Sequence, residues 1–379
     1  MKSLILLFTV LIGFEHFFVS KQNPVSTQGN QNPVNLYFEK EPSGKDRCHI
    51  NQPELDAIET VSALPKVFKF KPDWSIPSKP SICMPLNVYR EKLYGKLNMK
   101  VPTYNGSKKI KIAVIDTGLD FSIPAFKNKI YRPDHRLPEN FYGFDLTSMP
   151  NKNYFEPKDN NGHGTHVAGI IIGLFPNAEI LPIKYYDLPS NDQFDGSMAL
   201  AIRLAVTAGV DIINISGGGL GMDEREMVEL RRADDNGILV VAASGNDNSL
   251  LAGENKFYPA SYQMENIISV MSHNDHGQKS KFSNYGTDFS HIAALGEIYS
   301  YVPNHKNKKQ RCIGFMAGTS QATPFVTATA AMLMSKNPSW DYHKVKSTIL
   351  SSVDKTDAMK DLNQSAGTLN IYRTIAKNE

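Results

Sequence analysis

Three short runs place a serine, a histidine and an aspartate in settings that suit nucleophilic catalysis. They are DTG at 116–118, HGTHVAG at 163–169 and GTSQATP at 318–324, which supply Asp116, His163 and Ser320. A serine hydroxyl becomes a strong nucleophile when a base takes its proton, and a histidine base needs an anion that fixes its tautomer and stabilises its charged form. A lone residue of any of these types is more often solvated or capping, so the prediction depends on all three runs together.

Ser320 is the predicted nucleophile. Pro324 follows four residues later, and proline is tolerated in the first turn of a helix, where backbone N–H groups have no intrahelical partner. This favours a helix that begins at Ser320, with its macrodipole and free N–H groups directed at an oxyanion. A simple N-cap serine is the alternative, and GTSQATP alone would favour it.

His163 is the predicted general base, and Asp116 is predicted to orient it. His166 raises the alternative of a metal site, but H-x-x-H lacks the glutamate of H-E-x-x-H, so zinc chemistry has no support. Asp120 is the competing acid. The DTG run also occurs in aspartic proteases, which need a second catalytic aspartate, and no second D-T/S-G run is present.

Five runs closely resemble the signature blocks of the subtilisin-like serine proteases. They are IAVIDTGLD (112–120), HGTHVAG, DIINISGGG (211–219), VVAASGN (240–246) and GTSQATP, and the resemblance extends from about Lys109 to Tyr372. The chain order Asp, His, Ser also matches this family and differs from that of lipases and esterases, which carry a G-x-S-x-G elbow. The resemblance implies an α/β three-layer domain, in which helices cover both faces of a mainly parallel sheet. It also implies peptide-bond hydrolysis through an acyl-enzyme, with no cofactor and no catalytic metal.

The resemblance assigns further residues to the site. Asn246 would donate to the oxyanion together with the Ser320 N–H, although an asparagine in SGND is also an ordinary turn residue. The residues Ser216, Gly217, Gly218 and Gly219 would pair with an extended substrate and, with 242–246, flank the P1 pocket. Asp247 would lie at the pocket rim and Phe194 against the P4 side chain. We expect an apolar P4 preference and broad P1 tolerance with a modest basic bias.

One alternative for the glycine segment has little support, and two features differ from those common in the family. A dinucleotide loop of the form G-x-G-x-x-G would need glycine where Met222 stands. The short connection at 170–178 lacks the run of side-chain oxygens with which many bacterial subtilisins bind calcium, so we expect that site to be missing. INISGGG also lacks the leucine that often follows this serine, which predicts a more open P1 wall.

The pattern of apolar residues predicts the elements that position these side chains. Short Val/Ile-rich runs predict buried parallel strands at 110–115, 179–184, 210–215, 238–243 and 267–271. Helices are predicted between and after them, at 163–174, 195–208, 223–236, 320–335 and 340–352. Asp116 and Asn246 directly follow two of the strands, at the carboxyl edge where parallel sheets bind ligands.

Composition and the N-terminal region set the remaining expectations. A net charge of +3, from 41 basic and 38 acidic residues, argues against a nucleic-acid partner, and the basic run at 305–311 is interpreted as a solvated hairpin tip. Residues 1–20 are typical of a signal peptide, 21–105 are interpreted as a pro-segment and lead-in, and 106–379 as the peptidase domain. Cys48 and Cys83 could form a disulfide, whereas Cys312 is predicted to be a free thiol.

These observations predict a secreted or periplasmic serine endopeptidase. It would act as a monomer on protein or peptide substrates, with no membrane association in its mature form. The alternative is an inactive scaffold of the same family that serves as a binding protein. The presence of Asp116, His163, Ser320 and Asn246 together argues against that alternative.

Overall fold

The computed structural model describes residues 36–40, 46–50, 86–97, 108–147, 154–187, 198–303 and 312–376. The chain divides into two compact units, one of 1–66 with 134–141 and the other of 67–133 with 142–379. In the first unit, β1 (Leu36–Lys40) pairs antiparallel with β2 (Asp46–Ile50). The predictions for the signal peptide, Phe194, Cys83 and the basic run at 305–311 lie outside the described residues.

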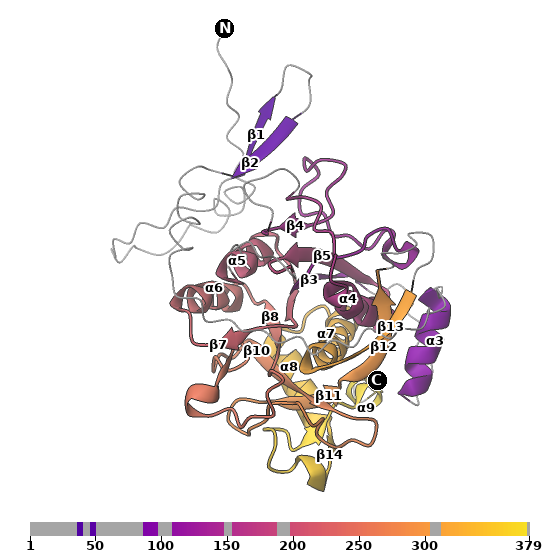
Figure 1. Cartoon of the computed structure of the whole chain (residues 1–379), viewed down its shortest axis with the longest axis vertical. Coiled ribbons are helices and arrows are strands. Elements are labelled where there is room, and N and C mark those ends of the chain that lie inside the picture. Colours follow the sequence, from indigo (N-terminus) through magenta and orange to yellow (C-terminus); the bar gives the residue numbers. More distant parts are fainter. Residues whose placement is uncertain are drawn as a thin grey trace. The chain divides into compact units, whose positions relative to one another are not determined.

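A nine-stranded sheet forms the centre of the described part of the second unit (Figure 1). Each neighbouring pair is parallel except the pair at the β14 edge. In spatial order the strands are β14 (Asp354–Lys355), β15 (Gly367–Thr368), β11 (Ile292–Leu295), β10 (Ile267–His273), β8 (Leu239–Ala243), β6 (Ile212–Ile215), β3 (Ile110–Asp116), β5 (Ala178–Lys184) and β4 (Phe144–Asp145). The predicted mainly parallel sheet is confirmed.

Helices cover both faces of this sheet (Figure 1). On one side lie α4 (His163–Leu174) and α7 (Thr319–Lys336), with α8 (Tyr342–Ser351) against α7. On the other side lie α5 (Met198–Thr207) and α6 (Glu224–Asp235). From β3 the chain continues to β4 at one edge of the sheet, returns through α4 to β5, and then passes β3 through α5 to reach β6. The strand order therefore reverses between β3 and β6.

The predicted elements are present with boundaries shifted by a few residues at most. All five predicted strands belong to the central sheet, and 163–174 is α4 to the residue. The strands are recognisable from sequence because they are apolar and buried on both faces, as in LVVAA of β8.

Several elements were not predicted. They include α3 (Leu86–Lys96), α9 (Ile371–Ala376), the strands β4, β11, β14 and β15 of the sheet, the antiparallel pair β7 (Gly219–Leu220) and β9 (Phe257–Tyr258), and the hairpin of β12 (Glu297–Val302) and β13 (Cys312–Ala317). The strands β12 and β13 flank the basic run that we interpreted as a hairpin tip. The antiparallel pairing of β12 and β13 agrees with a hairpin. That the basic run is solvated stays a prediction.

The helix α3 packs directly on α4. The Tyr94 hydroxyl donates to the Leu174 carbonyl at 2.7 Å, and Arg90 Nε donates to the Gly173 carbonyl at 3.0 Å. A Cβ atom at Gly173 would lie 2.6 Å from Tyr89 Cε1, so the glycine permits this close approach. The end of the predicted pro-segment and lead-in therefore includes a helix that belongs to the second unit.

Within the described ranges, no helix is both long and apolar enough to cross a membrane.

Candidate active site

Asp116 and His163 form a buried pair at the carboxyl edge of the sheet. Asp116 is the last residue of β3, and His163 is the first residue of α4. Nδ1 of His163 lies 2.6 Å from Oδ1 of Asp116, and the Thr117 N–H donates to the same oxygen at 2.7 Å. Because a carboxylate oxygen can only accept, the imidazole carries its proton on Nδ1 here.

Asp120, the competing acid, is engaged elsewhere. Its Oδ1 accepts hydrogen bonds from the backbone N–H and the hydroxyl of Ser122. The geometry thus pairs His163 with Asp116 and not with Asp120.

Asp159 is a residue of this region that sequence reasoning missed. Its buried carboxylate accepts the Thr117 hydroxyl at 2.9 Å, the Gly162 N–H at 2.7 Å and the Thr165 hydroxyl at 2.6 Å. The backbone N–H groups of Asn161 and Thr165 also donate to it, at 3.0 and 2.9 Å. Burial raises the pKa of Asp159, these donors oppose that rise, and the nearby charge of Asp116 adds to it.

This network ties the segment after β3 to the first turn of α4. A carboxylate at a helix N-terminus is stabilised by the free N–H groups and the dipole there. The signal that could have revealed it is an aspartate four residues before the first helical residue, in DNNGH.

Glycine also allows α4 to approach the end of β3. A Cβ atom on Gly164 would lie 2.2 Å from the Gly118 carbonyl oxygen and 3.2 Å from Asp116 Cβ. The lack of a side chain at Gly164 therefore lets the start of α4 lie close to the sheet. Gly169 instead faces β12, where a Cβ atom would lie 2.3 Å from Ser300 Oγ.

His166 has a packing role. Its Nε2 lies 3.2 Å from the Gly314 carbonyl oxygen and donates to it. Burial lowers the pKa of His166 to about 3, with the neighbouring His163 contributing in the same direction. Among the residues that the structure describes, no group of three or more potential metal ligands includes it.

Ser320 is the second residue of α7, and Pro324 lies inside that helix. We expected Pro324 in the first turn of this helix. It is the sixth residue of α7 and lies past that turn. A proline inside a helix leaves the carbonyl four residues earlier without its usual donor, and that carbonyl belongs to Ser320. Ser216 Oγ donates to it at 2.9 Å, which compensates for the missing hydrogen bond.

The side chain of Ser320 also contacts Ser216. Its Oγ donates to the Ser216 carbonyl oxygen at 2.7 Å, and the residue is 4% exposed. Ser216 follows β6, the neighbour of β3 at the point where the strand order reverses. The predicted nucleophile thus lies at the same edge as Asp116, where α/β sheets bind ligands.

Asn246 and the Ser320 N–H lie close to each other, next to Gly318. Asn246 Oδ1 accepts the Thr319 N–H at 2.9 Å and the Thr319 hydroxyl at 3.0 Å, so its amide NH₂ is directed away from Thr319. A Cβ atom built on Gly318 would lie 3.6 Å from Asn246 Nδ2 and 3.6 Å from the Ser320 nitrogen. Both donors therefore lie near one point, which is also 2.8 Å from Gln321 Oε1. Thr319 and Gly318 were not singled out from sequence, although they are the first residues of GTSQATP.

The predicted substrate-binding segments lie beside these groups. Gly219 pairs with Tyr258 across β7 and β9, which occupies one edge of that segment. A Cβ atom on Gly217 would lie 2.6 Å from the Tyr185 hydroxyl. Asp247 is exposed, as a rim residue should be, and its N–H donates to Asn284 Oδ1 at 2.9 Å.

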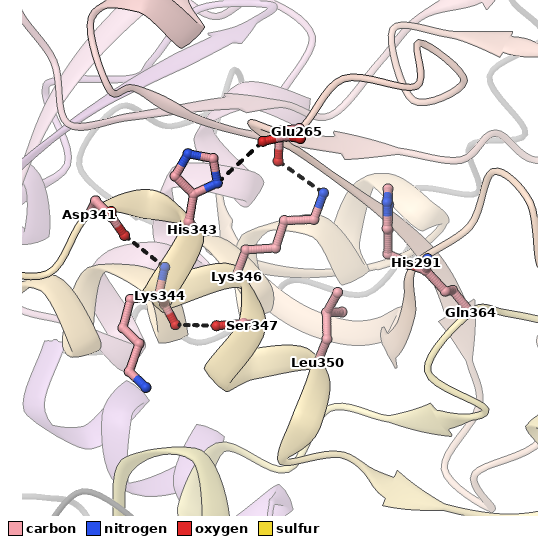
Figure 2. A pocket seen from close by; sticks show the side chains of 9 residues that line it. All are labelled: Glu265, His291, Asp341, His343, Lys344, Lys346, Ser347, Leu350 and Gln364. Atoms are coloured by element: carbon pink, nitrogen blue, oxygen red, sulfur yellow. Dashed lines mark hydrogen bonds and ion pairs between the residues drawn. The ribbon is translucent and has the colours of Figure 1, made fainter.

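A second concave region, on the α8 side of the second unit, offers no comparable chemistry (Figure 2). Lys346 and His343 point toward Glu265 there, and Lys346 Nζ donates to the carbonyl oxygens of Glu265 and Ile267 at 3.0 and 2.7 Å. Burial lowers the pKa of Lys346 to about 8. These charged groups are engaged with one another and with the backbone. The lining residues are Glu265, His291, Asp341, His343, Lys344, Lys346, Ser347, Leu350 and Gln364.

Comparison with known proteins agrees with this geometry. The sequence profile described as the subtilase family matches residues 107–372. The cell wall-associated protease of Bacillus subtilis (strain 168) is 35% identical over 254 residues, which cover 64% of this chain and 25% of that protein. The thermophilic serine proteinase of Bacillus sp. (strain AK1) is 34% identical over 244 residues, 61% of this chain and 53% of that protein. The chain thus spans from a quarter to about half of the length of these relatives.

Two solved structures are also similar. The prenylagaramide maturation protease PagA has a TM-score of 0.54 and 28% identity, covering 76% of this chain and 97% of that one. A lanthipeptide protease has a TM-score of 0.61 and 21% identity, covering 80% and 100%, and supports the fold alone.

Proposed function

Because this chain belongs to the subtilase family, we propose that it is a serine endopeptidase that hydrolyses peptide bonds through an acyl-enzyme. The observation that carries the proposal is the buried 2.6 Å contact between Asp116 and His163, at the sheet edge where α7 presents Ser320. Burying a histidine together with the carboxylate that orients it costs free energy, because both groups must leave water. The pair is therefore a specific feature of such a site.

The chemistry begins with the Ser320 hydroxyl. In the resting enzyme its proton is held by the Ser216 carbonyl, so rotation about the Cα–Cβ bond would redirect it to His163 Nε2. His163 takes this proton while Oγ attacks the scissile carbonyl, and Asp116 stabilises the resulting imidazolium. The negative oxygen of the tetrahedral intermediate would then accept from Asn246 Nδ2 and the Ser320 N–H.

Collapse of that intermediate completes the first half of the reaction. His163 gives its proton to the leaving amine, and Ser320 remains acylated. A water molecule, deprotonated by the same histidine, then releases the acid product and restores the hydroxyl.

The remaining parts of the proposal concern the substrate and the setting. Extended peptides would pair with Ser216–Gly219, with Phe194 at P4 and Asp247 at the P1 rim. The first 20 residues would direct secretion, or export to the periplasm, of a monomeric zymogen that matures by loss of its pro-segment. We expect the mature enzyme to be free of membrane and nucleic acid.

The decisive experiment is labelling with a fluorophosphonate, which reacts only with an activated serine. Wild-type protein should be labelled and should hydrolyse peptides, and Ser320→Ala should do neither. Ser335→Ala, at the other end of the same helix, is the matched control and should keep both activities. A folded wild-type protein that is never labelled would instead identify an inactive binding scaffold.

A further inference from the structure

The space beside the proposed nucleophile lies between two chain segments. The Ser216 carbonyl accepts from Ser320 Oγ, and Asn246 Oδ1 accepts from the Thr319 N–H. The segments 216–219 and 244–246 therefore flank the start of α7 on two sides. On the proposed function, the substrate side chain next to the scissile bond, P1, has to enter between them.

The ring of Phe257 extends from one of these segments to the other. A Cβ atom on Gly218 would lie 2.8 Å from Phe257 Cε1, whereas one on Gly245 would lie 2.9 Å from Cγ and 3.0 Å from Cδ2. Cε1 and Cδ2 are opposite corners of the phenyl ring. Glycine at both positions therefore allows the ring to lie between the segments, in contact distance of each.

The backbone on both sides holds this ring in place. Phe257 pairs with Leu220 across β9 and β7. Its N–H donates to Ser261 Oγ at 3.1 Å, and its carbonyl accepts the Ser261 N–H at 2.8 Å. The residue is 8% exposed, so its ring cannot move aside without displacing packed neighbours.

We propose that Phe257 forms the floor of the P1 pocket and restricts P1 to glycine, alanine and serine. This inference rests on the proposed function. A larger side chain entering between 216–219 and 244–246 would overlap the ring, and overpacking of this kind is unfavourable. The charge of Asp247 lies at an exposed rim, where solvent screening leaves it little influence. The preference inferred here is narrower than the broad P1 tolerance that the sequence alone suggested.

The test compares two peptides that are identical except for alanine or phenylalanine at P1. Wild-type enzyme should cleave the alanine peptide with the higher kcat/KM. In Phe257→Ala the ratio of phenylalanine to alanine should rise about 100-fold, because a pocket contact of one or more methylenes is worth about 10- to 200-fold in discrimination. Phe257→Leu should give an intermediate ratio and serves as the second variant if the alanine variant folds poorly.

Phe289→Ala is the matched control. Phe289 is a partly buried phenylalanine of the second unit whose ring centroid lies 4.9 Å from Lys256 Nζ, and the substitution should leave the ratio unchanged. Active enzyme is counted by fluorophosphonate titration, which needs Ser320 but no P1 pocket. Labelled wild-type enzyme that prefers phenylalanine, or a ratio unmoved in both Phe257 variants, would overturn the inference while leaving the proposed function intact. Absence of labelling in wild type would overturn the proposed function itself.

Discussion

The two halves of the candidate active site are built in different ways. The half that contains Asp116 and His163 is buried, and Asp159 accepts five hydrogen bonds there, of which the one from Thr117 ties its two chain segments together. In the other half the Asn246 side chain is exposed while Thr319 and Ser320 are buried, and within the described residues its oxygen accepts hydrogen bonds from Thr319 alone.

This difference follows from when each half carries charge. The carboxylate of Asp116 is present throughout the cycle, so it must be paired and hydrogen-bonded to remain buried. On the proposed function, the donors Asn246 Nδ2 and the Ser320 N–H would act only when negative charge develops on the substrate, so the substrate must be able to reach them. Substitutions should therefore affect the two halves unequally.

The largest effect is expected on the buried half. Asp116→Asn should lower kcat by about 10⁴-fold, because an amide can no longer fix the proton on Nδ1 of His163. Steady-state kinetics corrected for active-site concentration would measure this. Asp120→Asn is the matched control and should stay close to wild type. A large loss in the control, with little in Asp116→Asn, would exchange the roles of the two acids.

A smaller effect is expected on the exposed half. Asn246→Ala should lower kcat by about 10²- to 10³-fold with little change in KM, because its hydrogen bond strengthens only in the transition state. The neighbouring Asp247→Asn should leave kcat unchanged. An unaltered turnover number in Asn246→Ala would remove that residue from the oxyanion site.

The unfolding free energy should also differ between substitutions in the two halves, and Asp159→Asn tests this. An amide presents its NH₂ group where Thr165 and its neighbours donate, which should cost about 1–3 kcal/mol of unfolding free energy. Urea unfolding is best measured in a Ser320→Ala background, which prevents self-digestion. Asn246→Ala in that background should unfold like its parent. Equal stability of the two variants would show that Asp159 does not hold the buried half together.

The smallest effect concerns His166 of α4. The pKa of His166 is about 3 in the folded state, below its ordinary value of 6.5, so the unfolded chain binds more protons between these values. Folding stability should therefore fall as the pH drops below about 6.5, by roughly 1 kcal/mol between pH 7.5 and pH 5.5 from this residue. His166→Gln keeps a donor for the Gly314 carbonyl and should flatten the pH dependence. An identical slope in the variant would assign the acid sensitivity to other groups.

The predictable parts of this molecule are those whose signal is local. Val/Ile runs such as IIN in β6 predict buried strands. The runs DTG, HGTH and GTS single out Asp116, His163 and Ser320 as candidates from a few neighbouring residues. Asp159 has a local signal in DNNGH, but its hydrogen bond to Thr117 could not be recognised in this way, because the two residues meet only after folding. Phe257 is an ordinary apolar residue in sequence, and its place between Gly218 and Gly245 depends on three separate loops. The helix α3 was missed because its apolar residues show little helical periodicity.

The packing of α3 against α4 restricts how this protein can be trimmed. The helix that begins with His163 ends at Leu174, and its last turn is covered by Tyr89, Arg90 and Tyr94. A cut between α3 and β3 would leave these contacts without a covalent tether, and loss of α3 would uncover apolar surface at the far end of the helix that carries the proposed general base. A maturation cut that keeps this support attached must fall before Leu86, so the mature enzyme would start well upstream of the first residue of β3.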